Sequence, residues 1–126
     1  MWTRGVVDVQ YVGSHTRNLD RSYFNNTPLP GPGAIEARRP NQLFGEIRTF
    51  QNDMIANYQA VSFILRQRMS RGLQGTAHYT WSRTRDQTDH SNNNDGRATQ
   101  DPYNPTADYG PAYWDVPHRV VASWVY

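Results

Sequence analysis

The amino-acid sequence predicts an all-β protein: an antiparallel meander of about four long strands joined by two long loops, as in part of a transmembrane β-barrel. Three observations predict this fold. Apolar and polar residues alternate in segments of about ten residues, the length at which a tilted strand crosses a bilayer. Aromatic residues make up 13% of the chain, although only 37% is hydrophobic. The connecting loops are too long for a small compact domain.

The first strand is predicted over residues 5–15, with one face formed by Val7, Val9 and Tyr11 and the other by Asp8, Gln10 and Ser14. Residues 16–40 contain many Asn, Pro and Gly residues without a sustained period, so they are predicted to form a long loop. Residues 43–50 form either a short strand or a continuation of that loop.

The second strand is predicted over residues 57–69, with faces formed by Val61, Phe63 and Leu65 and by Ser62, Arg66 and Arg68. Ile64 is an exception to this alternation. A helix is the alternative, because Ala60, Phe63 and Ile64 lie close together on a helical wheel. The β-branched and aromatic residues favour a strand.

A tight turn follows at residues 70–72, where Gly72 suits a positive φ angle. The third strand, residues 73–84, alternates most regularly, with Leu73, Gly75, Ala77, Tyr79 and Trp81 against Gln74, Thr76, His78, Thr80, Ser82 and Thr84. A second long loop is predicted over residues 85–117. The last strand begins at His118, with Val120, Ala122, Trp124 and Tyr126 opposite Arg119 and Ser123.

Loop length distinguishes the two ends of this meander. One end has a very short turn, and the other has loops of roughly 25 to 33 residues. Transmembrane β-barrels have the same asymmetry, with short periplasmic turns and long extracellular loops. The sequence has no apolar run of about 18 residues and no signal peptide. It is therefore either a cytosolic protein or a piece of a longer chain.

No residue pattern indicates catalysis, so the chain is predicted not to be an enzyme and to need no cofactor. There is no cysteine, and the four histidines, His15, His78, His90 and His118, lack metal-site spacing. The Asp-rich second loop shows no acid–base spacing. The net charge of +2 is spread along the chain, which does not favour a nucleic-acid partner.

The segment Asp89–Gly96 is similar in composition to a calcium-binding loop. The spacing does not fit, because Asn94 stands where glycine is needed and Gln100 where glutamate is needed. A polar loop is the favoured interpretation, and a weak calcium site stays open as the alternative.

Four blocks of the sequence resemble consecutive pieces of a known family: Tyr11–Leu19, Tyr58–Leu73, Tyr79–Ser82 and Asp115–Arg119. In this order they are similar to the barrel domain of TonB-dependent outer-membrane receptors, in the Oar-like, carboxypeptidase-regulatory-domain-containing group. Three blocks depart from the family pattern. Arg83 replaces a lysine, Val61 replaces a leucine, and Asp108-Tyr109-Gly110 replaces Glu-Arg-Gly.

The resemblance implies that residues 1–126 are a fragment of a receptor barrel in the outer membrane of a Gram-negative bacterium. The signal peptide, the plug domain and the TonB-contacting segment are absent from the sequence, so Met1 is interpreted as an internal or artificial start. The implied function is uptake of large nutrients, which the fragment alone does not perform. The implied partners are outer-membrane lipid, the rest of the barrel and plug, and the TonB complex through the missing parts.

The resemblance also implies an orientation in which residues 70–72 are periplasmic and both long loops are extracellular. Lipid-facing residues are then Val61, Phe63, Leu65, Val120 and an aromatic girdle of Tyr79, Trp81, Trp124 and Tyr126. Lumen-facing residues are Ser62, Arg66, His78, Thr80, Ser82, Arg119 and Ser123.

A second hypothesis is a soluble β-sandwich module whose Trp and Tyr side chains stack on carbohydrate. The position of the aromatic residues distinguishes the two hypotheses. Aromatic residues gathered in residues 85–117 and on one exposed sheet face would indicate sugar binding, whereas bands at the strand ends indicate a membrane girdle.

Overall fold

The computed structural model describes residues 5–70, 72–87 and 99–126, and this part of the chain is all-β. The strands are β1 (Gly5–Phe24), β2 (Arg48–Ser70), β3 (Leu73–Asp86), β4 (Gly110–Pro111) and β5 (His118–Val125). Two short 3-10 helices, η1 (Glu36–Arg38) and η2 (Pro105–Asp108), lie in the connections. No helix among the described residues is long and apolar enough to cross a membrane.

The strands form one sheet in the order β1-β2-β3-β4, and β5 also pairs with β3. This confirms the predicted meander. The helical alternative for residues 57–69 is wrong, because they lie within β2. The β-sandwich alternative is also wrong for the described residues, since they contain no second sheet that could face the first.

β1 and β2 are longer than predicted. The loop prediction was wrong for residues 16–24, which continue β1, and the predicted start of β2 at residue 57 was wrong because the strand begins at Arg48. Polar residues occupy both faces of these extensions, so the two-residue period that marks a half-buried strand is missing. Cross-strand polar contacts hold them instead, as between Arg48 Nη2 and Ser22 Oγ at 3.1 Å.

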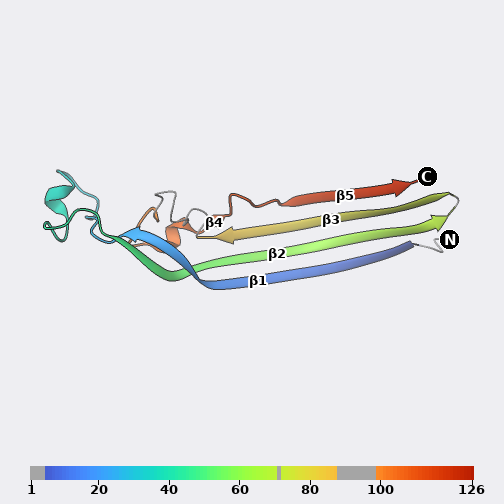
Figure 1. Cartoon of the computed structure of the whole chain (residues 1–126), viewed down its shortest axis with the longest axis horizontal. Coiled ribbons are helices and arrows are strands. Elements are labelled where there is room, and N and C mark those ends of the chain that lie inside the picture. Colours follow the sequence, from blue (N-terminus) through green and yellow to red (C-terminus); the bar gives the residue numbers. More distant parts are fainter. Residues whose placement is uncertain (1–4, 71, 88–98) are drawn as a thin grey trace. The chain divides into compact units, whose positions relative to one another are not determined.

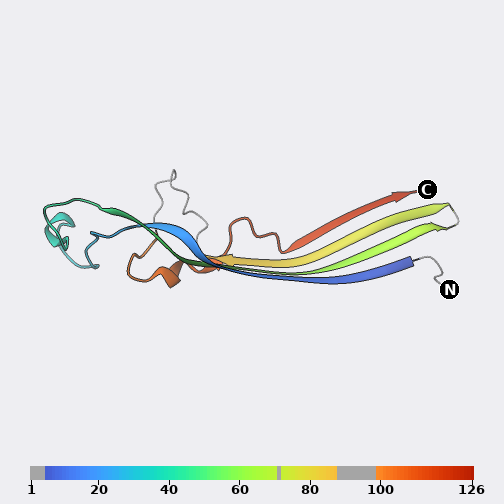
Figure 2. The ribbon, with the colours of Figure 1, turned by 60° about the horizontal axis from the view of Figure 1, so that its bottom comes forward.

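The chain divides into two compact units. The sheet unit comprises Met1–His15, Asn57–Arg85 and Pro111–Tyr126, and the loop unit comprises Thr16–Ala56 and Asp86–Gly110. Within the sheet unit, the strands run side by side in both views, and successive strands point in opposite directions (Figures 1 and 2). The β2–β3 turn and the end of β5 consequently lie at the same end of the sheet.

The register between β3 and β5 defines the two faces of the sheet unit. Tyr79 pairs with Val120 and Trp81 with His118, so these side chains share one face. Thr80 pairs with Arg119, and every second residue along both strands shares this opposite face with them. The alternation predicted from the sequence is therefore continuous across two strands that are far apart in the chain.

Two glycines serve this arrangement. Gly72, in the turn between β2 and β3, has a φ of 83°, a conformation that residues with a Cβ rarely adopt. Gly75 lies opposite Trp124 on β5, and a Cβ at Gly75 would lie 3.1 Å from Ser123 O and 3.2 Å from Trp124 Cβ. Glycine at this position therefore lets the β5 backbone and the Trp124 Cβ lie close against β3.

The interior of the loop unit is mostly polar. Met54 is fully buried. The other buried residues described in this unit are polar or charged: Arg21, Ser22, Asn26, Arg39 and Asp86. Arg21 donates two hydrogen bonds to Asp53, from Nε to Oδ1 at 2.7 Å and from Nη2 to Oδ2 at 2.9 Å. The Arg21 guanidinium also lies over the Tyr23 ring, 4.5 Å from its centroid. Directional polar contacts, rather than a large apolar core, therefore hold the two strand extensions together.

Replacing Asp53 with asparagine tests the importance of this ion pair. The Arg21 side chain is only 6% exposed, so its charge would lose its partner while remaining buried. Because Asp53 is 31% exposed, we expect the free energy of local opening to fall by about 2 kcal/mol, near the value of a charged hydrogen bond. Hydrogen exchange in residues 16–24 and 48–56 should then accelerate roughly 30-fold in the detergent-refolded chain.

Asp8→Asn is the matched control, because Asp8 makes a further Arg–Asp contact between β1 and β2. Its bond to Arg66 is 3.0 Å long, but the two side chains are 37% and 53% exposed. An exposed pair contributes less than about 1 kcal/mol. Equal effects of the two substitutions, or no effect of Asp53→Asn, would contradict this explanation.

Candidate functional site

One face of the sheet unit carries a row of aromatic rings at the level of Tyr79. The Tyr79 ring stacks on Phe63 at 6.3 Å and on His118 at 6.2 Å between centroids. Tyr79 Oη and His118 Nδ1 are also hydrogen-bonded at 2.9 Å. Trp81 pairs with His118 at the edge of this row and is 51% exposed. Three strands therefore contribute rings to one exposed aromatic level.

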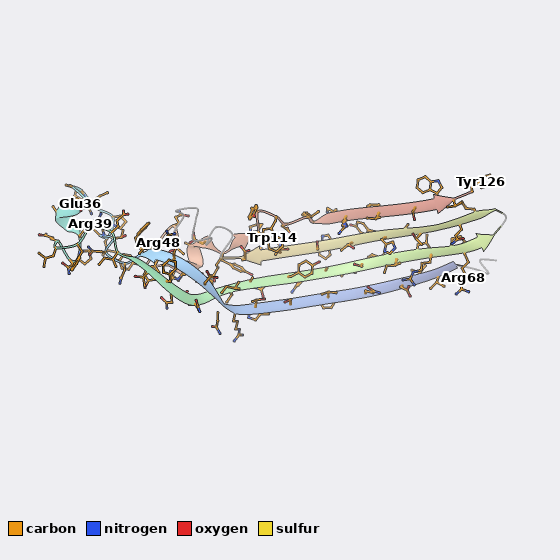
Figure 3. All side chains as sticks on the ribbon, in the orientation of Figure 1. Glu36, Arg39, Arg48, Arg68, Trp114 and Tyr126 are labelled. Carbon is orange, nitrogen blue, oxygen red and sulfur yellow. The ribbon has the colours of Figure 1, made fainter. Side chains whose placement is uncertain are left out.

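A second aromatic level lies at the other end of β3. Trp124 is opposite Gly75, and the Tyr126 ring approaches within 3.8 Å of the Cβ position of Gly72. Figure 3 labels Tyr126 beyond the end of β5. The predicted girdle residues thus fall into two pairs, Tyr79 with Trp81 and Trp124 with Tyr126.

The outer edges of the two levels, Trp81 and the Tyr126 ring beside Gly72, are separated by about the height of a membrane-facing band. Trp81 and Gly72 are nine residues apart in the sequence. At about 3.3 Å per residue this is about 30 Å of strand, and a strand tilt of about 40° reduces the height to about 23 Å. The apolar band of outer-membrane barrels is about 25 Å tall and is bordered by aromatic residues on both sides.

The opposite face carries the polar residues predicted from the sequence. Ser62 Oγ and Thr80 Oγ1 are hydrogen-bonded across β2 and β3 at 3.0 Å, and Thr76 Oγ1 and Ser123 Oγ across β3 and β5 at 3.1 Å. Arg66 reaches Asp8 on β1. This face therefore carries all members of the predicted polar set, which are Arg66, His78, Thr80, Ser82 and Arg119, spread along β2, β3 and β5.

Burial differs between the two faces. Ala60 and Ile64 are each two residues from Ser62 on β2, so they share its face, and they are only 5% and 7% exposed. Phe63, on the aromatic face, is 46% exposed. Ile64, which interrupts the sequence pattern, is therefore an apolar side chain buried by its neighbours on the polar face. The same face is not polar throughout, because Val121 on β5 is 49% exposed. On β2, Ala60, Ser62 and Ile64 of the polar face are nevertheless less exposed than Phe63 on the aromatic face.

The segment before β5, residues 112–117, is a loop as predicted, and hydrogen bonds fasten it to the end of β3. Asp115 Oδ1 accepts a hydrogen bond from the Thr84 N–H at 2.8 Å, and Ser82 Oγ donates to Val116 O at 2.8 Å. The Ser82 N–H also donates to Pro117 O at 3.0 Å. The sequence analysis placed Asp115 in a block that resembles the receptor family but did not predict its contact with Thr84.

The long connection in the loop unit is organised around Asn26. Its Nδ2 lies 2.8–2.9 Å from the carbonyl oxygens of Asn41, Phe44 and Gly45, and its Oδ1 accepts from the Asn41 N–H at 2.9 Å. One buried amide side chain thereby closes the connection between β1 and β2.

Arg39, the C-cap residue directly after η1, supports the same connection. It binds both carboxylate oxygens of Glu36, at 2.7 Å and 2.8 Å, and donates from Nη1 to Asn26 O at 2.9 Å. Glu36 and Arg39 lie close together in Figure 3. The hydrogen bonds from Arg39 lower the pKa of the Glu36 carboxyl below its ordinary value, and the same bonds raise the pKa of Arg39.

No metal centre is found in the part of the chain that the structure describes, where no group of three or more His, Cys, Asp or Glu residues converges. The calcium-like segment Asp89–Gly96, together with His90, lies outside the described residues.

The lowered pKa of Glu36 gives a testable pH dependence. A glutamate whose folded-state pKa is lowered stabilises the fold at pH values above its ordinary pKa, and this contribution is lost as the pH falls through the lowered pKa. We expect carboxyl ¹³C NMR of the refolded chain to show Glu36 titrating below the usual glutamate range, and Arg39→Met to return it to that range. An ordinary pKa for Glu36 with Arg39 in place would contradict the assignment.

Comparison with known proteins agrees with this geometry. A family model described as an outer membrane beta barrel domain matches residues 1–126. No curated protein matches the chain, and no solved structure does. The family match covers the sheet with its two aromatic levels as well as the loop unit. The chain therefore belongs to the outer membrane β-barrel domain family, whose members lie in the outer membrane.

Proposed function

We propose that this chain forms part of the barrel of a TonB-dependent receptor of the Oar-like, carboxypeptidase-regulatory-domain-containing group in a Gram-negative bacterium. The observation that carries the proposal is the meeting of two sequence blocks that resemble this group. Tyr79–Ser82 and Asp115–Arg119 are far apart in the chain, yet Trp81 pairs with His118 and Ser82 binds Val116 and Pro117. These contacts explain why the two blocks would occur together in one sequence.

In this proposal the aromatic face meets lipid and the polar face meets the lumen or the plug. Between the two aromatic levels, the aromatic face of β3 and β5 contains only Gly75, Ala77, Val120 and Ala122. The opposite orientation would expose Arg66, His78 and Arg119 to lipid. An arginine facing lipid costs about 2–4 kcal/mol at the bilayer midplane and about 0–1 kcal/mol near the interfaces, where Arg119 would lie. The cost of desolvating the two arginines therefore favours the proposed orientation.

The proposed mechanism is capture of a large nutrient by the extracellular loops, followed by displacement of the plug through energy from TonB. The loop unit would supply part of the capturing surface, and the sheet unit part of the wall. The partners are outer-membrane lipid, the rest of the barrel, the plug and the TonB complex. The proposal assigns the chain no catalytic activity, no cofactor and no nucleic-acid partner.

Cysteine labelling of the whole receptor in intact cells tests the orientation. The sequence has no cysteine, so an introduced one is unique within it. Ala107→Cys, an exposed position in η2, should react with a membrane-impermeant maleimide from outside. Gln74→Cys, exposed beside the β2–β3 turn, should react only after the outer membrane is permeabilised. The reverse pattern, or labelling of both positions in intact cells, would overturn the orientation.

The reading frame around this sequence tests the finer assignment. A TonB-dependent receptor requires a plug domain and a TonB-contacting segment in the same reading frame, together with further alternating strands. A frame with further strands but no plug would reject the TonB-dependent class and retain an outer-membrane barrel. A 126-codon frame with its own promoter and stop codon, giving a soluble monomer, would reject the proposal.

A further inference from the structure

The loop unit contains a hollow of about 570 Å³, within the range of small-molecule sites. Its walls are Pro28, Leu29, Arg38, Pro40 and Tyr103. Both long connections contribute, because Tyr103 belongs to the connection between β3 and β5. Tyr103 is fixed across the hollow by its Oη, which donates to Thr27 O at 2.6 Å. Two proline rings and a tethered tyrosine make most of this surface rigid and apolar.

Arg38 is the only charged residue among the described residues that line the hollow. Its Nη1 donates to Leu29 O at 2.6 Å, which fixes the guanidinium plane. The Arg38 Nε–H is buried and has no acceptor among the described residues. The Glu36 carboxylate accepts hydrogen bonds from Nε and Nη2 of Arg39 instead. No carboxylate in the described ranges lies within 4.0 Å of the Arg38 guanidinium, so its charge has no ion-pair partner there.

We infer that this hollow binds a small organic carboxylate with a planar ring, either free or as the terminal group of a larger molecule. The carboxylate would accept hydrogen bonds from Arg38, for which guanidinium geometry is suited. The ring would lie against Tyr103 and the two prolines, which offer apolar surface without a competing charge. A neutral ligand of the same shape would leave the arginine charge without a partner.

This inference names a ligand class for the loop unit, and its place in nutrient capture depends on the proposed receptor function. The binding itself depends only on the hollow. The receptor function and the binding can therefore fail separately. Absence of a plug in the reading frame would reject the receptor function but would leave binding in the hollow unaffected.

The experiment measures binding of 2-naphthoate to the full chain in detergent by ligand-observed saturation-transfer NMR, with empty micelles as the blank. The neutral amide, 2-naphthamide, has nearly the same shape and is the ligand control. We expect 2-naphthoate to bind in the micromolar to millimolar range and the amide to bind at least about 10-fold more weakly, as for loss of one charged hydrogen bond. Arg38→Gln should weaken 2-naphthoate binding by a similar factor.

Arg83→Gln is the matched protein control, because it removes an exposed arginine from the sheet unit. Arg38→Lys guards against misfolding, because it keeps the charge but loses the planar fork, and an intermediate affinity is expected. Hydrogen exchange of residues 25–47 checks that each variant keeps the connection folded. Equal binding of acid and amide, unchanged affinity in Arg38→Gln, equal weakening by Arg83→Gln, or no binding by the wild type would overturn the inference.

Discussion

The register between β3 and β5 determines the other features of the sheet unit. It aligns the two-residue periods of the two strands, so that their aromatic and polar faces continue across the sheet. Tyr79 lies beside Val120 and Thr80 beside Arg119 because of this register. A slip of one residue would bring Arg119 beside Tyr79 and mix the charged and aromatic faces. Gly75, which leaves room for Trp124, and Asp115, which binds the Thr84 N–H, both stabilise the observed register.

The loop unit is stabilised by different physics. It has one fully buried large apolar side chain, Met54, among the described residues, and its other buried groups are polar or charged. Directional bonds hold these groups in place: Arg21 donates to Asp53, Asn26 donates to backbone carbonyl oxygens, and Arg39 donates to Asn26 O. Such networks specify one conformation without requiring a wide apolar face. The unit can therefore present Pro28, Leu29 and Tyr103 at its surface, where they line the hollow beside Arg38.

The sequence was sufficient to predict the features that repeat locally. The faces of β3 and β5 and the turn at Gly72 follow from alternation and from the conformational freedom of glycine. The extensions of β1 and β2 were missed because Arg21 and Asp53 are paired across strands and leave no period in either strand alone. The hollow was missed for a related reason. Tyr103 and Thr27 meet only after folding, and nothing near either residue in the sequence indicates their contact.

We propose that the aromatic face meets lipid and the polar face meets water. Spin labels at neighbouring positions of β5 test it most directly, with Val120→Cys and Arg119→Cys labelled in the receptor reconstituted in bilayers. The account predicts that the label at position 120 collides mainly with oxygen, which concentrates in lipid, and the label at 119 mainly with a water-soluble nickel chelate. Equal accessibility at the two positions, or the reverse pattern, would contradict the account.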